Sequence, residues 1–95
     1  MLKSINQNLP LTEIDNLLDL FNQKAYSEVI KKTYLLIQKY PNNEQLFNIM
    51  GITLLTIEQY KKSIVFFKKS IRLNPNNAKS YFNIGVAHHE LVNLK

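Results

Sequence analysis

Apolar side chains recur every three or four positions along most of the chain, and short segments rich in asparagine and proline interrupt them. This spacing places the apolar side chains on one face of an α-helix, because a helix completes a turn in 3.6 residues. The pattern predicts five helices, over residues 11–23, 26–40, 44–57 and 60–73 and from residue 78 onward. Pro41 and Pro75 are expected to end the second and fourth helices, since proline disfavours a helical conformation in the residue before it.

One short string of residues returns at a fixed distance along the chain. Pro41-Asn42-Asn43 is repeated as Pro75-Asn76-Asn77, 34 residues later. Other positions keep the same step, in the pairs Tyr26 and Tyr60, Ile30 and Ile64, Ile37 and Ile71, Leu20 and Leu54, Phe47 and Tyr81, and Gly51 and Gly85. A period of this length, with two helices in each unit, predicts an all-α helix-turn-helix repeat solenoid whose units bury their apolar faces against their neighbours.

The period also divides the chain into parts. Residues 1–9 are predicted to be an N-terminal extension, 10–43 a degenerate first repeat, 44–77 a second repeat, and 78–95 the first helix of a truncated third repeat. Gly51 lies in the middle of a predicted helix, where glycine costs about 1 kcal/mol relative to alanine. We therefore expect the backbone of the next helix to pass close to it.

Composition restricts the function further. The chain has no cysteine, which excludes a disulfide framework and a thiolate metal site. Residues 1–10 lack an apolar run of signal-peptide length, and no later run approaches the roughly 18 apolar residues of a membrane span. These features predict a cytoplasmic protein that does not contact a membrane.

No group of side chains in the sequence suggests catalysis or a cofactor. His88 and His89 point about 100° apart on a helix and have no second histidine or acidic pair at i+4, so they do not converge on one metal ion. Glu13, Asp15 and Asp19 have no nucleophile or matched acid nearby, and we interpret them as solvated charges. The sequence also lacks a glycine-rich phosphate loop. We expect no enzymatic activity, no cofactor and no metal.

The net charge of +5 raises the question of nucleic acid. The predicted helix 60–73 carries a basic strip, formed by Lys61, Lys62, Lys68, Lys69 and Arg72. This strip lies opposite the apolar side of the same helix, on the expected outer surface, where solvated lysine is the ordinary choice. We expect no nucleic-acid partner, and binding of an anionic ligand through helix 60–73 is the alternative.

The repeated positions resemble those of the tetratricopeptide repeat (TPR) family. Its pattern is a large aromatic, Leu-Gly, Tyr, a small residue, an aromatic and a proline. The corresponding positions in the second unit are Phe47, Met50-Gly51, Leu54, Ser63, Phe67 and Pro75, and those in the next unit are Tyr81, Ile84-Gly85 and His88. The first unit departs from the pattern, since Leu17 replaces the glycine. The resemblance implies a right-handed superhelix of antiparallel helices, with Tyr81 and His88 as core residues.

The same resemblance implies a protein-protein interaction module in which the first helix of each unit lines a concave groove. Carried over by position, the groove residues are Ile14, Leu18, Phe21, Gln45, Asn48, Ile52, Leu55, Lys79, Phe82, Asn83, Val86 and His89. This lining is largely apolar, which favours a hydrophobic or amphipathic segment as the ligand, for example a helix laid into the groove. We expect neither the family's carboxylate clamp nor its asparagine ladder, because Ile14, Leu18 and Ile49 occupy positions that those modes need.

Three functions remain open on the sequence alone. The first is a scaffold or adaptor that binds a protein or peptide segment in the groove. The second is the substrate-recognition arm of a larger enzyme, such as a glycosyltransferase or sulfotransferase. The third is self-association through the uncovered face of the last helix, which would act as an open edge of the solenoid.

Overall fold

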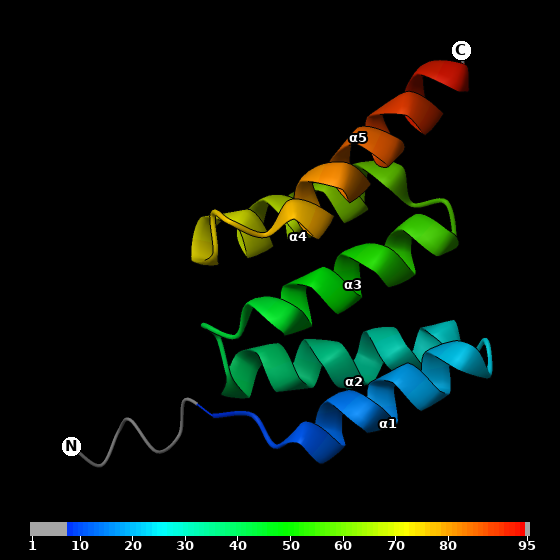
Figure 1. Ribbon diagram of the computed structural model, residues 1–95. Helices are drawn as coiled ribbons and strands as arrows, with labels where there is room; N and C mark the ends of the chain where they lie inside the picture. The colour runs from blue at the N-terminus through cyan, green and yellow to red at the C-terminus, as the bar shows by residue number, and fades with distance from the viewer. Residues whose placement is uncertain (1–7, 95) are drawn as a thin grey trace.

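The structure is a computed structural model that describes residues 8–94. These residues fold into helices that stack in sequence order (Figure 1). The five helices of this region are α1 (Leu11–Asn22), α2 (Tyr26–Lys39), α3 (Glu44–Thr56), α4 (Tyr60–Leu73) and α5 (Ala78–Asn93). The prediction of an all-α repeat with five helices is confirmed. The predicted extension over residues 1–9 lies mostly outside the described residues, and the division into repeats stays a prediction.

Helix boundaries follow the local signals in the sequence. Asn43 and Asn77 cap α3 and α5, and each side chain accepts a hydrogen bond from the backbone N–H three residues later, at 3.2 Å. Lys24 and Glu58 follow the ends of α1 and α3 and have positive φ angles of 64° and 67°. They lie 34 residues apart, so both hairpins reverse the chain at the same repeat position, with a residue in the left-handed conformation.

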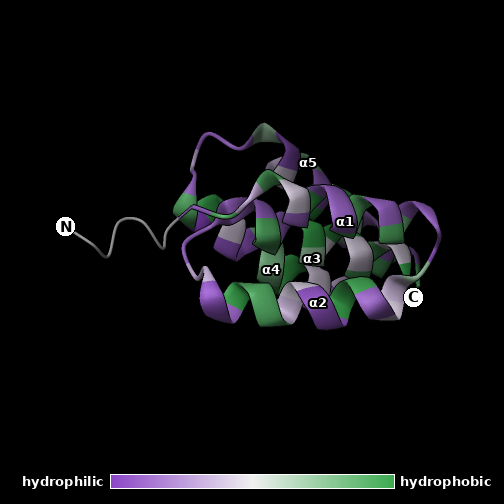
Figure 2. Ribbon diagram, turned by 90° about the horizontal axis from the view of Figure 1, so that it is seen from below, coloured by the Kyte–Doolittle hydropathy of each residue, from purple (hydrophilic) through white to green (hydrophobic). Residues whose placement is uncertain are grey.

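The helices are amphipathic, and Figure 2 shows hydrophobic and hydrophilic residues alternating around α2. Buried apolar side chains come from α1, α2, α3, α4 and α5, and they are Ile14, Leu17, Val29, Leu46, Phe47, Ile49, Met50, Leu54, Ile64, Phe67 and Ala87. The core is therefore a continuous layer between successive helices, as expected of a solenoid whose units cover one another.

Gly51 makes room for an aromatic ring. A Cβ atom placed on Gly51 would lie 2.6 to 2.9 Å from three ring atoms of Phe67, which is completely buried. The atoms nearest to this position belong to a side chain of α4, and the prediction that its backbone also passes close by stays a prediction. A side chain of α4, not its backbone, occupies the space that the missing Cβ leaves, and this brings α3 and α4 into the most extensive helix contact of the described chain.

The first hairpin has the opposite order of residue sizes at the equivalent positions. Residues 17 and 33 stand 34 positions before Gly51 and Phe67, and they are Leu17 and Thr33. Both are buried, with exposed fractions of 1% and 0%. In α1 and α2 the larger side chain therefore comes from the first helix and the smaller one from the second. The degenerate first unit thus fills these two equivalent core positions with one large and one small side chain in the opposite order.

Two residues expected in the core are exposed. Tyr81 is 52% exposed, and His88 is also exposed, although Phe47 and Leu54 at the equivalent positions of α3 are 6% and 7% exposed. The physical reason is that α4 covers this face of α3, whereas no described element covers the same face of α5. The prediction that Tyr81 and His88 are core residues is wrong for the described chain.

Replacing the two glycines by alanine should change stability in opposite directions. Gly51→Ala is expected to lower the free energy of unfolding by about 1 to 3 kcal/mol, because the new methyl group must displace the buried Phe67 ring. Gly85→Ala should raise it by up to about 1 kcal/mol, since nothing lies within 4 Å of a Cβ there and alanine favours helix. Urea unfolding followed by circular dichroism measures both, and an equal effect of the two changes would contradict the packing described for Gly51.

Thr33 carries a buried hydroxyl with no hydrogen-bond partner among the described residues. Thr33→Val is expected to raise the free energy of unfolding by about 1 kcal/mol, because valine keeps the shape and removes the unsatisfied polar atom. Thr53 is the matched control, since it is equally buried but its hydroxyl donates to the Ile49 carbonyl oxygen at 2.8 Å. Thr53→Val should therefore bring no gain in the same unfolding experiment.

Candidate functional site

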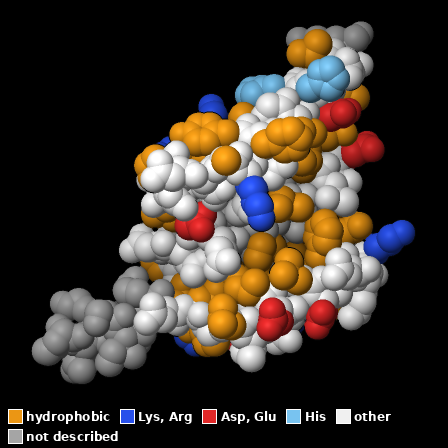
Figure 3. Space-filling model, in the orientation of Figure 1, with side chains coloured by type: hydrophobic (Ala, Val, Ile, Leu, Met, Phe, Trp, Pro, Cys, Tyr) orange, Lys and Arg blue, Asp and Glu red, His pale blue; other side chains and the backbone are white. Residues whose placement is uncertain are grey.

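The candidate site is the face formed by α1, α3 and α5, which we call the concave face because the sequence predicts a groove there. In Figure 1, α1 lies in front of α2 and α5 passes in front of α4, so the first helix of each hairpin faces the viewer. Figure 3 shows apolar side chains gathered over the middle of this face, with acidic side chains along its lower edge. The acidic residues of α1 are Glu13, Asp15 and Asp19.

The α1 part of the predicted groove contributes less surface than the sequence suggests. Ile14 is only 8% exposed and belongs to the hydrophobic core, so its side chain offers almost nothing to a ligand. Phe21 is half-buried and packs edge-to-face on Tyr26, with ring centroids 5.2 Å apart. Leu18 is 45% exposed and remains accessible. Placing Ile14 in the groove lining is thus corrected, because α1 turns that side chain inward against α2 and α3.

The α3 and α5 parts are more open. Gln45, Lys79 and His89 are exposed, Phe82 is 72% exposed, and Asn48, Ile52, Leu55, Asn83 and Val86 are half-buried. Phe82 is thus the most exposed aromatic side chain that the structure describes. It borders a hollow of about 420 Å³ together with Lys79, Asn83 and Ala78.

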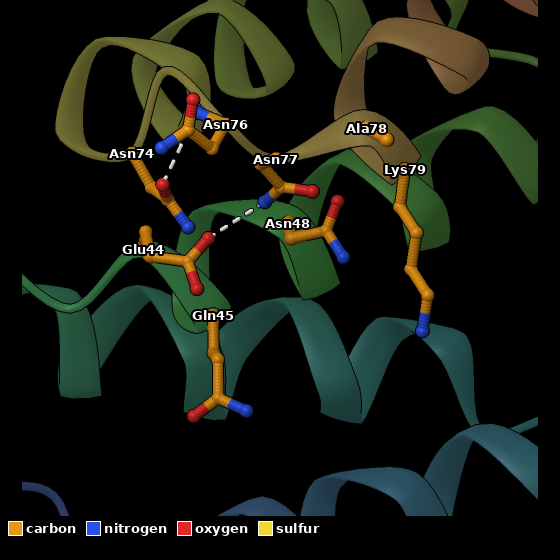
Figure 4. Close-up of a pocket in the computed structure, with 8 residues that line it drawn as sticks. All are labelled: Glu44, Gln45, Asn48, Asn74, Asn76, Asn77, Ala78 and Lys79. Atoms are coloured by element: carbon orange, nitrogen blue, oxygen red, sulfur yellow. Dashed lines mark hydrogen bonds between the residues drawn. The ribbon is translucent and has the colours of Figure 1, made fainter.

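A second hollow, of about 330 Å³, lies where α3 and α5 begin. Eight residues line it: Glu44, Gln45, Asn48, Asn74, Asn76, Asn77, Ala78 and Lys79. Figure 4 shows Gln45 and Lys79 extending away from the backbone, while Asn77 turns toward Glu44. The free amide and ammonium groups of this hollow can donate hydrogen bonds to backbone or side-chain oxygens of a ligand.

A buried polar network joins the second hairpin to α5. The Asn77 amide donates to Glu44 Oε1 at 2.7 Å and to Ser70 Oγ at 3.2 Å. The Ser80 hydroxyl lies 3.1 Å from both Ser70 Oγ and Asn48 Oδ1. Ser70 and Ser80 are completely buried, so the bond between their hydroxyls is made in a low-dielectric environment where polar groups need partners. The network fixes the start of α5 against α3 and α4, and with it the hollow above.

Sequence reasoning missed this network, although the sequence contains a signal for it. The residue 34 positions before Ser80 is Leu46, and the residue 34 positions before Ser70 is Leu36. Two apolar core positions are thus replaced by serine together. A paired exchange of this kind indicates that the two hydroxyls bond to each other, because a single buried hydroxyl would remain unsatisfied.

The two histidines stand apart from any metal-like cluster. Both are exposed, and His89 Nε2 lies 3.2 Å from the side-chain amide nitrogen of Asn93. Within residues 8–94, no group of three or more His, Cys, Asp or Glu side chains gathers in a way that could hold a metal ion.

Charge is segregated between the two sides of the stack. α4 carries five basic side chains and no acidic one, whereas α1 carries three acidic side chains and no basic one. Lys61, Lys62, Lys68 and Arg72 are exposed. Lys69 is half-buried, with its ammonium 5.8 Å from the centroid of the Phe47 ring, so this lysine also packs against the core.

Comparison with known proteins agrees with this architecture. The family model described as TPR repeat matches residues 53–92. A TPR repeat-containing protein of Borreliella burgdorferi (strain ATCC 35210 / DSM 4680 / CIP 102532 / B31) is 36% identical over 73 residues, which cover 73% of this chain. The chain carries tetratricopeptide repeats.

TPR repeats are protein-protein interaction modules, and proteins of the family are generally scaffolds without enzymatic activity. The alignment covers 32% of the Borreliella relative, so this TPR chain spans about a third of the length of that protein. None of the helices between residues 8 and 94 is both long and apolar enough to cross a membrane.

Because of the polar network, we expect Asn77 to contribute more to the free energy of unfolding than Asn43, the equivalent residue one repeat earlier. Asn43→Ala is expected to lower the free energy of unfolding by about 1 kcal/mol through loss of the α3 cap. Asn77→Ala should cost about 2 kcal/mol, because it removes the α5 cap and also the two hydrogen bonds that the Asn77 amide donates to Glu44 and Ser70. Equal losses for the two variants in urea unfolding would show that the bonds to Glu44 and Ser70 add nothing.

Proposed function

We propose that this TPR chain binds an amphipathic segment of another protein along the concave face of α1, α3 and α5. The observation that carries the proposal is the 72% exposure of Phe82, a large apolar side chain on the face where Ile52, Leu55 and Val86 are half-buried. An exposed aromatic beside partly covered aliphatic residues is typical of a binding surface, because water leaves such a surface readily when a ligand covers it.

Polar groups at the rim favour a peptide rather than a small molecule. Gln45, Asn48 and Lys79 border the hollow at the start of α3 and α5, where they can bond to carbonyl or carboxylate oxygens of a peptide. At the other end of the face, Asp15 and Asp19 are exposed beside Leu18. We therefore expect the segment to present apolar side chains to the middle of the face and a basic side chain to the α1 end.

A second proposal keeps the same binding surface but makes it part of a larger enzyme. The chain spans only about a third of the length of the Borreliella protein. In this alternative the groove belongs to the substrate-recognition arm of a larger enzyme, such as a glycosyltransferase or sulfotransferase. The ligand would then be a protein substrate that is released after modification.

Selection from a random peptide library displayed on phage tests the groove without a known partner. Peptides selected on the native chain should be rich in apolar and basic residues. Their affinity, measured by fluorescence anisotropy, should fall at least tenfold on Phe82→Asp and on Leu55→Asp, because a charge must be buried beneath the ligand. Circular dichroism confirms that both variants remain folded.

Val65→Asp is the matched control, because Val65 is 64% exposed on α4, away from the concave face. This variant should bind the selected peptides like the native chain. Peptides whose affinity is lowered by Val65→Asp and not by Phe82→Asp would move the binding surface to the opposite side and contradict the proposal.

A further inference from the structure

We propose that the outer side of α2 and α4, which points away from the concave face, binds the surface of an anionic lipid membrane. In Figure 1 each of these helices lies behind the first helix of its hairpin, so both are directed to the back of the stack. The residues that we call the basic outer face are all exposed, and they are Lys31, Lys32, Leu35 and Lys39 of α2 and Lys61, Lys62, Val65, Lys68 and Arg72 of α4. The inference does not depend on the function proposed for the groove.

Positive charge gathers on the second helix of each hairpin. α2 and α4 together carry eight basic side chains and one acidic side chain, Glu28. The first helices have the opposite balance, since α1, α3 and α5 carry five acidic side chains and one basic side chain, Lys79. A surface that is merely solvated usually mixes the two signs. The separation therefore favours a ligand with many negative charges for the basic outer face.

An exposed aliphatic side chain lies in the middle of these cations. Val65 is 64% exposed, on the side of α4 opposite the buried Ser63 and Phe67. Successive residues of a helix are about 100° apart, so all the cations of α4 project within about 60° of Val65; they are Lys61, Lys62, Lys68, Lys69 and Arg72. On α2, Leu35 is 65% exposed, and the cations that flank it at i−4, i−3 and i+4 are Lys31, Lys32 and Lys39.

This combination of groups favours lipid over nucleic acid. The phosphates of a nucleic acid would pair with the cations, but its backbone offers no apolar partner for Val65 and Leu35. At an anionic membrane, the ammonium groups of the lysines can reach the headgroups while the aliphatic side chains between them enter the apolar layer beneath. The basic outer face provides both kinds of group on the same side of the molecule.

Peripheral binding differs from the membrane contact that the sequence argues against. The sequence predicts no membrane contact because no segment is apolar enough to span a bilayer. Binding to the surface needs no such segment, since several cations close to anionic headgroups add their attractions. A chain bound in this way would direct its concave face away from the membrane, so the groove would stay open to a protein segment.

Sedimentation of the chain with lipid vesicles tests the proposal. Vesicles of phosphatidylcholine that contain about a third phosphatidylserine should carry the chain into the pellet, and its affinity should be at least tenfold lower for vesicles of phosphatidylcholine alone. Binding should also weaken as salt is added, because counterions screen the attraction. No binding to the phosphatidylserine vesicles at low salt, or equal binding to both kinds of vesicle, would overturn the proposal.

Charge reversals locate the surface that binds. Lys62→Glu and Lys68→Glu should each lower the affinity for phosphatidylserine vesicles at least fivefold, because each replaces an attraction by a repulsion. Lys79→Glu changes the net charge by the same amount on the concave face, and it should alter the affinity by no more than about twofold. Equal losses for the three variants would show that total charge, and not the basic outer face, is responsible, and would overturn the proposal.

Changes at Val65 that leave the charge constant separate a membrane from other polyanions. Val65→Ser should lower the affinity for phosphatidylserine vesicles severalfold and Val65→Leu should raise it, since the apolar area that enters the membrane becomes smaller or larger. Neither change should alter the affinity for single-stranded RNA. Circular dichroism checks that both variants remain folded, which the exposure of Val65 leads us to expect. Vesicle binding that neither substitution alters would overturn the proposal, and tighter binding of RNA than of vesicles would assign the basic outer face to nucleic acid instead.

Discussion

The packing of the large Phe67 side chain against the small Gly51, between α3 and α4, is the constraint on which the rest of the structure depends. Phe67 occupies the space that Gly51 leaves free, and this close fit holds α3 and α4 together. Because α3 is fixed in this way, its other faces can cover α2 on one side and present Asn48, Ile52 and Leu55 on the concave side. The position of the candidate groove is therefore a consequence of a contact in which the groove residues take no part.

Hydrogen bonds, rather than the packing of apolar side chains, position the start of α5. Hydrogen bonds among Glu44, Ser70, Asn77 and Ser80, of which the one between the two serines is buried, replace apolar contacts at this junction. Such bonds add little net stability compared with hydrophobic burial, but they are directional, and a buried hydroxyl without its partner is costly. The junction between the second hairpin and α5 therefore permits few alternative orientations, which suits a helix that carries Phe82 on one face and Gly85 on another.

Most of the architecture could be predicted from the sequence, because helix ends and the repeat are encoded locally. The predicted boundaries agree with α1 to α4 to within one residue, and Asn43 and Pro41 mark them for simple steric and hydrogen-bonding reasons. Burial was harder to predict. Ile14 was placed in the groove and Tyr81 in the core, since a repeat position was assumed to have the same neighbours in every unit. Exposure depends on which helix lies opposite, and a periodic pattern within a single helix does not report that.

The exchange of Leu17 and Thr33 for Gly51 and Phe67 limits how this sequence can be rearranged. Pairing α1 with α4 would set Leu17 against the Phe67 ring, and pairing α3 with α2 would leave a void between Gly51 and Thr33. The whole α3–α4 hairpin carries its own complementary pair and can be moved, duplicated or grafted into another stack. A single helix cannot, so the hairpin is the smallest part of this chain that recombination or protein engineering can treat as a module.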